Sequence, residues 1–136
     1  MSSHTLHLDE SAFIDAFVLR EKRDRWRTLL AHAKGRPKIL DRLNHHHPDH
    51  LDLRHAIEIV TGNSRAIVDT LQKLGAGPTA HVIAGSDEFE GRDIPFTEAL
   101  HHFVSYPFAV IVSCVPGRLA AFHAEWPTSF IVLRRS

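Results

Sequence analysis

One apolar run decides the fold: Phe108-Ala109-Val110-Ile111-Val112-Ser113-Cys114-Val115. The turn signal Pro116-Gly117 follows it. Two further β-rich runs come next, at 118–125 and 130–133, and the turn at 126–129 separates them. Three short β-rich runs separated by turns predict an antiparallel meander. The first and third runs are apolar at consecutive positions, so both faces of these strands are expected to be buried. The meander should therefore form the core of the domain.

The residues upstream of the meander predict helices and two more strands. Apolar residues at helical spacing predict helices over 11–33, 37–44, 66–74 and 95–104. Within the first of these, a mixed charge run at 20–25 is either a solvated helical turn or a break. Short strands are predicted at 57–60 and 79–84. The order strand, helix, strand, helix, strand is typical of parallel crossover units.

These elements predict an α+β (mixed α/β) fold in one domain covering residues 1–136. Its helical part is expected at about 9–44 and its sheet-containing part at about 51–135. The N-terminal helices should pack on a roughly five-stranded mixed sheet that ends in the antiparallel C-terminal meander.

Composition excludes several functional classes. The chain has 136 residues, of which 43% are hydrophobic and 24% charged, as in ordinary globular domains. Its 16 basic and 16 acidic residues cancel, so neither nucleic acid nor a membrane surface is an expected partner. The N-terminus lacks a signal-peptide pattern and the single cysteine suits a reducing compartment, so we expect a cytoplasmic protein. The sequence contains no cofactor motif, and no cofactor is expected.

Two polar loops follow the predicted parallel strands and are the candidate ligand site. In the first, Thr61, Asn63 and Ser64 precede a helix whose amides suit an anion. The second, at 86–93, contains Ser86 and Arg92 as candidate ligand-binding residues, and Asp87, Glu88 and Glu90 as candidate catalytic acids and bases. If the two strands are neighbours, the loops meet beyond their carboxyl ends. The alternative is a surface loop whose acids cap the next helix.

Cys114 and a histidine cluster are two further candidates. A thiolate beside an imidazole is a nucleophile, and His123 is the histidine nearest to Cys114 in the sequence. In the predicted hairpin, however, His123 lies four residues beyond the position opposite Cys114. A buried, unreactive thiol is therefore the simpler interpretation of Cys114. The twelve histidines of the chain include His46, His47 and His50, which are candidate metal ligands. Pro48 disfavours a helix that would align them, and a solvated connector is the alternative.

Two functional hypotheses remain. The first is a non-enzymatic module that binds a small ligand or a protein and self-associates. The second is a small enzyme, with acid–base or metal-assisted hydrolytic chemistry, in a site formed by the loops 61–64 and 86–93. The first is favoured because no nucleophile–base pair or ligand set has convincing spacing. The last strand is apolar on both faces, and an open side would have to be covered by the N-terminal helices, by insertion between other strands of the sheet, or by another subunit. The last of these alternatives predicts a homodimer through the C-terminal strands.

Overall fold

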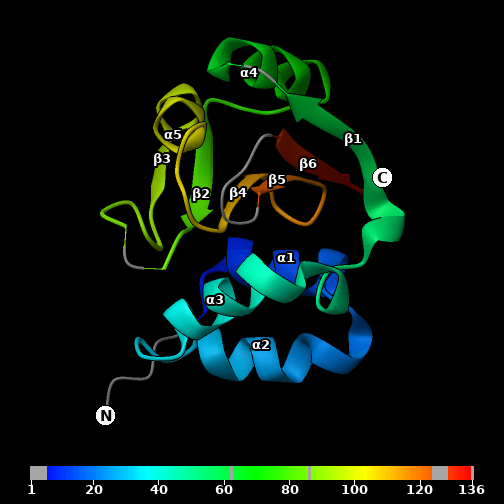
Figure 1. Cartoon of the computed structure of the whole chain (residues 1–136), viewed down its shortest axis with the longest axis vertical. Helices are drawn as coiled ribbons and strands as arrows, with labels where there is room; N and C mark the ends of the chain where they lie inside the picture. The colour runs from blue at the N-terminus through cyan, green and yellow to red at the C-terminus, as the bar shows by residue number, and fades with distance from the viewer. Residues whose placement is uncertain (1–5, 62, 86, 124–128, 136) are drawn as a thin grey trace.

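The computed structural model describes residues 6–61, 63–85, 87–123 and 129–135, and shows one antiparallel sheet between two layers of helices (Figure 1). The strands are β1 (Ala56–Thr61), β2 (Thr79–Ile83), β3 (Asp93–Pro95), β4 (Val110–Val115), β5 (Leu119–His123) and β6 (Ser129–Arg134). The α-helices are α1 (Leu8–Phe17), α2 (Arg23–Leu30), α3 (Arg36–His46), α4 (Ser64–Lys73) and α5 (Phe96–Phe103). The predicted α+β class is thus confirmed.

The strand order is β1-β6-β5-β4-β2-β3, and every neighbouring pair is antiparallel. The predicted meander is confirmed, because β4 pairs with β5 and β5 with β6. The predicted parallel part is wrong: β6 inserts beside β1, and β2 pairs antiparallel with β4. The sheet also has six strands instead of about five, since Asp93–Pro95 pairs with β2.

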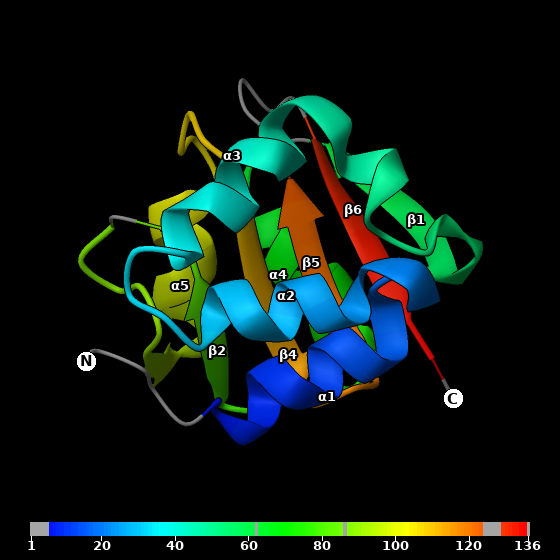
Figure 2. The ribbon, with the colours of Figure 1, turned by 90° about the horizontal axis from the view of Figure 1, so that it is seen from below.

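Apolar side chains fill both faces of the sheet, as predicted for the run that begins at Phe108. On one face, Ile111, Phe122 and Leu133 pack against the N-terminal helices, which cover the sheet in Figure 2. On the other face, Val112 and Val132 pack against α4 and α5. Each central strand therefore contributes alternate side chains to two separate cores.

The charge run at 20–25 is a break in the predicted first helix. α1 ends at Phe17, a 3₁₀ turn covers Arg20–Lys22, and α2 starts at Arg23. α2 then ends at Leu30, and Gly35 passes so close to the Leu29 carbonyl that a β-carbon would lie 2.3 Å from its oxygen. Only glycine permits this approach. The tight turn places Arg36, the first residue of α3, near α1 and the sheet.

β6 is an interior strand, which removes the reason for expecting a dimer through it. It pairs with β1 on one side and β5 on the other, and Val132 is fully buried. Of the three predicted ways to cover this strand, insertion between other strands of the sheet is therefore the one observed. The edges of the sheet are β1 and the three-residue strand β3. Among the helices within the described ranges, none combines the length and the apolar composition needed to cross a membrane. Of the predicted turn at 126–129, residues 126–128 lie outside the described residues, and Ser129 is the first residue of β6.

Candidate functional site

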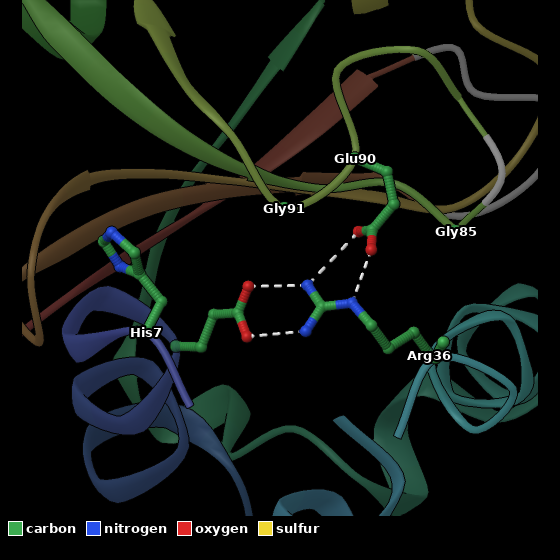
Figure 3. Close-up of a pocket in the computed structure, with 7 residues that line it drawn as sticks. His7, Arg36, Gly85, Glu90 and Gly91 are labelled. Atoms are coloured by element: carbon green, nitrogen blue, oxygen red, sulfur yellow. Dashed lines mark hydrogen bonds and ion pairs between the residues drawn. The ribbon is translucent and has the colours of Figure 1, made fainter. Parts of the chain in front are cut away.

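A polar pocket lies between α1, α3 and the loop that joins β2 to β3 (Figure 3). Its volume is about 520 Å³, which is within the usual range for small-ligand sites. Its lining residues come from four parts of the chain: His7, Glu10, Ala33, Arg36, Gly85, Glu90 and Gly91. Figure 3 shows Arg36 between two carboxylates, one of which belongs to Glu90.

Local structure explains how three charged side chains reach this pocket. Glu10 lies in the first turn of α1, where a carboxylate is favoured by the helix dipole, and its side chain is 2% exposed. Arg36 opens α3 directly after the Gly35 turn. Glu90 lies in the β2–β3 loop, and its Oε1 accepts a hydrogen bond from the Ala84 backbone N–H at 3.0 Å. The network therefore ties two helices to the sheet.

The guanidinium of Arg36 has no hydrogen-bond donor to spare. Nη1 donates to Glu10 Oε1 at 2.8 Å and to the Leu30 carbonyl at 3.0 Å. Nη2 donates to Glu10 Oε2 at 2.6 Å and to Glu90 Oε1 at 3.4 Å. Nε donates to Glu90 Oε2 at 2.5 Å. Because a guanidinium carries five N–H groups, these contacts use all of them.

The same contacts determine the charges in the network. Burial alone raises the pKa of Glu10, but hydrogen bonds from Arg36 and His81 outweigh burial and lower that pKa from 4.5 to about 2. For His81, burial lowers the pKa, and hydrogen bonds to Glu10 and Asp93 raise it above the usual value of 6.5. Burial likewise opposes the charge of Arg36, and its two carboxylate partners raise its pKa. These contacts therefore favour the charged forms of Glu10, His81 and Arg36.

A second polar cluster begins where the first one ends, at His81 of β2. His81 Nε2 lies 2.7 Å from Glu10 Oε2, and His81 Nδ1 lies 2.7 Å from Asp93 Oδ1. The His7 ring stacks on the His81 ring, with centroids 4.0 Å apart, and His7 Nε2 lies 3.3 Å from Asp93 Oδ2. Asp9 completes the group, since its Oδ1 accepts a hydrogen bond from the Ser113 hydroxyl at 2.8 Å.

Histidine and carboxylate side chains are metal ligands, and the protein has two clusters that contain histidines. In the ranges that the structure describes, one group of three or more potential ligands comes together, namely His7, Asp9, His81 and Asp93. One ligand atom from each lies within 4.8 Å of the others. The predicted candidates His46, His47 and His50 are not in this group.

The three predicted metal candidates have separate surroundings. His46 is exposed at the end of α3. The His47 ring packs on Phe122, and burial lowers its pKa. His50 is buried, and its Nδ1 accepts a hydrogen bond from Trp26 Nε1 at 3.2 Å.

The two predicted ligand loops follow the carboxyl ends of β1 and β2, which lie at the same end of the sheet, but the loops are not neighbours. Three strands separate β1 from β2, which places their ends about 19 Å apart across the sheet. The condition under which the loops 61–64 and 86–93 would form one site is therefore not met. Each loop instead contacts α5: Ser64 Oγ lies 3.5 Å from His101 Nδ1, and Asp87 Oδ2 lies 2.9 Å from His102 Nε2.

The individual loop candidates have mostly local contacts. Thr61 ends β1, and the Asn63 side chain caps α4 by accepting a hydrogen bond from the Ala66 N–H at 3.1 Å. Asp87 Oδ1 accepts from the Phe89 N–H at 2.9 Å, which is the capping role of an ordinary turn.

The remaining residues of the second loop differ in exposure. Glu88 and Arg92 are exposed, and the Arg92 guanidinium lies over the Phe89 ring. Ser86 lies outside the described residues. Of the residues predicted for this site that lie within the described ranges, Glu90 is the one that lines the pocket.

Cys114 has the environment of a structural thiol. It lies at a bulge in β4 on the α4–α5 face, and burial raises its pKa to about 12. A thiol with that pKa is not a thiolate at neutral pH and is a poor nucleophile. His123 of β5 pairs with Val110 of β4, which is four residues before Cys114, so the histidine is distant from the thiol, as the predicted hairpin indicated.

Glu10, Arg36, His81, Asp93 and His7 were not predicted as site residues. One signal was present for His81, because it interrupts an apolar strand that is buried on both faces. A buried histidine needs a polar partner, and here the partners come from the N-terminal helix and from β3. No local pattern marks Glu10 or Arg36.

No protein-family model, no curated protein and no solved structure matches this chain.

Proposed function

We propose that the protein is a non-enzymatic module that binds a small ligand in the pocket between α1, α3 and the β2–β3 loop. The observation that carries this proposal is the set of contacts around Arg36, which uses every guanidinium N–H on groups of the protein itself. Side chains that hold one another in this way form a rigid, preorganised floor. They are poorly placed for proton transfer, because their charges are mutually stabilised.

The unused hydrogen-bonding capacity of the floor indicates the ligand class. Arg36 has no free donor for an anion, whereas each carboxylate offers about four acceptor sites. Glu10 accepts three hydrogen bonds and Glu90 accepts three, so both retain acceptor capacity. The lining also contains two carboxylates against one guanidinium. We therefore propose that the ligand is a small amine, which donates hydrogen bonds and carries positive charge.

A ligand-pair experiment tests this proposal. Putrescine and succinate have the same four-carbon length and opposite charge, and we expect putrescine to raise the thermal unfolding temperature while succinate does not. Ala33 lines the pocket on the turn between α2 and α3 without joining the charged network, so Ala33→Phe should fill the pocket and abolish the putrescine response. Ala66→Phe, at an exposed position on α4, is the matched control and should retain it. An equal response to both compounds, or an unaltered response in Ala33→Phe, would contradict the proposal.

Self-association is a separate part of the proposal, and the edge strand β1 supports it better than β6. β1 pairs with β6 on one side only, and its Ile57 is 49% exposed. Two copies pairing at this edge would cover that side chain and satisfy the free backbone groups. We expect light scattering over a dilution series to give the mass of a dimer, and Ile57→Lys to give a monomer. Phe108→Lys, at another exposed apolar residue, should leave the dimer intact. A wild-type monomer at every concentration would refute self-association.

A further inference from the structure

We propose that His7, Asp9, His81 and Asp93 form a binding site for one divalent transition-metal ion of the zinc class. One ligand atom from each of these residues lies within 4.8 Å of the others. Around a tetrahedral zinc ion, neighbouring nitrogen and oxygen ligands lie roughly 3.4 Å apart, so only a small contraction is required. Two imidazoles and two carboxylates are a donor set that zinc accepts. This inference does not rest on the proposed amine pocket, although His7 also lines that pocket.

The four ligands come from elements that the fold holds together. His7 and Asp9 begin α1, where the His7 side chain caps the helix, and the two other ligands face each other across the β2–β3 pair. The His81 side chain is fully buried, whereas the Asp93 side chain is 54% exposed. A small shift of Asp93 would therefore close the ligand set around an ion. Its exposure also provides a path by which an ion enters from solvent.

Surrounding hydrogen bonds support the ligands in the way that metal sites require. A metal-bound histidine usually donates its other ring N–H to a carboxylate, which orients the ring and strengthens it as a ligand. His81 has this arrangement, since Nδ1 faces Asp93 while Nε2 contacts Glu10 at 2.7 Å. Glu10 is itself held by Arg36 at 2.6 Å. Ser113 similarly holds one oxygen of Asp9 and leaves the other available.

His7 must exchange one contact to bind the ion. Its Nδ1 accepts a hydrogen bond from the Asp9 backbone N–H at 3.0 Å, while Nε2 faces Asp93. A metal ion on Nε2 would leave the ring proton on Nδ1, so the helix-capping hydrogen bond would be lost. The amide signal of Asp9 should therefore move when the ion binds, which gives a readout specific to this site.

Cobalt(II) provides the test, because it substitutes for zinc and absorbs visible light when tetrahedrally bound. We expect chelator-treated protein to bind one equivalent of cobalt with this absorption, and zinc to displace it. Asp93→Asn and His7→Gln each remove a ligand that is partly exposed, so the fold should be retained and cobalt affinity should fall at least about tenfold. His46→Gln, an exposed histidine of the other cluster, should leave the affinity unchanged.

The outcomes separate this site from the amine pocket and from adventitious binding. Ala33→Phe should retain cobalt affinity even though it blocks the pocket, because Ala33 is not among the four ligands. Absence of the absorption band in the wild type, or weakening by His46→Gln as large as that by Asp93→Asn, would overturn the metal site. Absence of putrescine binding by the wild-type protein, together with normal cobalt binding, would instead count against the amine pocket alone.

Discussion

Replacing Arg36 with methionine is expected to lower the free energy of unfolding by about 3–5 kcal/mol. Methionine retains most of the volume of the arginine stem but leaves Glu10 buried without its main cation. Glu90 also loses its partner at 2.5 Å and, with it, the contact that ties the β2–β3 loop to α3. Urea denaturation of both proteins at neutral pH, in the presence of a chelator, measures this difference.

Arg27→Met is the matched control for this substitution. Arg27 pairs with Asp15, and both side chains are substantially exposed, at 37% and 61%. A solvent-exposed ion pair contributes at most about 1 kcal/mol, so the control should lose little stability. If both variants lost the same amount, or if Arg36→Met lost less than about 1 kcal/mol, the network around Arg36 would not be a principal connection between the helices and the sheet.

Acid unfolding gives a second readout of the same network. The pKa of Glu10 is lowered in the folded state from 4.5 to about 2, so its contribution is present above pH 4.5 and is lost as the pH falls towards 2. That difference corresponds to about 3 kcal/mol. In Arg36→Met the pKa of Glu10 should rise, and stability should change less over this interval. His81 has the opposite pH dependence, because its pKa is raised in the folded state. Its contribution to stability is present at low pH and is lost as the pH rises through the folded-state pKa.

Ile111→Asp should prevent the protein from folding. Ile111 is fully buried in β4 and packs in the core beneath the N-terminal helices, where an aspartate would have no partner. Val112→Asp, which points into the opposite core, should have the same effect because both faces of this strand are buried. Each substitution is expected to cost more than about 4 kcal/mol, which is a large part of the stability of a domain of this size.

Thr79→Asp, at an exposed position of the neighbouring strand β2, is the matched control and should fold normally. Soluble expression and a cooperative thermal transition measured by circular dichroism decide the outcome. A native-like transition in either core variant would mean that the corresponding face of β4 is not buried.

Local pattern was sufficient to predict most elements of this fold but not the direction in which the strands pair. The apolar runs beginning at Phe108 and Phe130 identified strands buried on both faces. The charge run at 20–25 left a solvated turn and a break as alternatives, and the structure has the break, between α1 and α2. Whether two strands pair parallel or antiparallel depends on the position that each strand takes in the sheet. The last strand enters between β5 and β1, and nothing in its own sequence specifies that partner. β3 was missed because three residues ending in Pro95 carry too little pattern to indicate a strand.

The candidate site was harder to predict because its charges come from distant positions. Arg36 is 26 residues from Glu10 and 54 from Glu90 in sequence, and each looks like an ordinary surface residue in its own segment. Their pairing depends on the Gly35 turn, which positions α3, and on the antiparallel β2–β3 pair, which positions the loop. The sequence therefore identified Glu90 within a polar loop but assigned that loop to a different partner.

The most direct test of the proposed binding site is amide chemical-shift mapping by nuclear magnetic resonance during a putrescine titration. We expect the largest shifts at the backbone amides that frame the pocket, namely those of Ala33, Gly85 and Gly91. Glu10 and Arg36 should follow, and the shifts should disappear in Ala33→Phe. Shifts centred on Asn63 and Ser64, or no saturable shifts at all, would contradict the placement of a ligand site between α1, α3 and the β2–β3 loop.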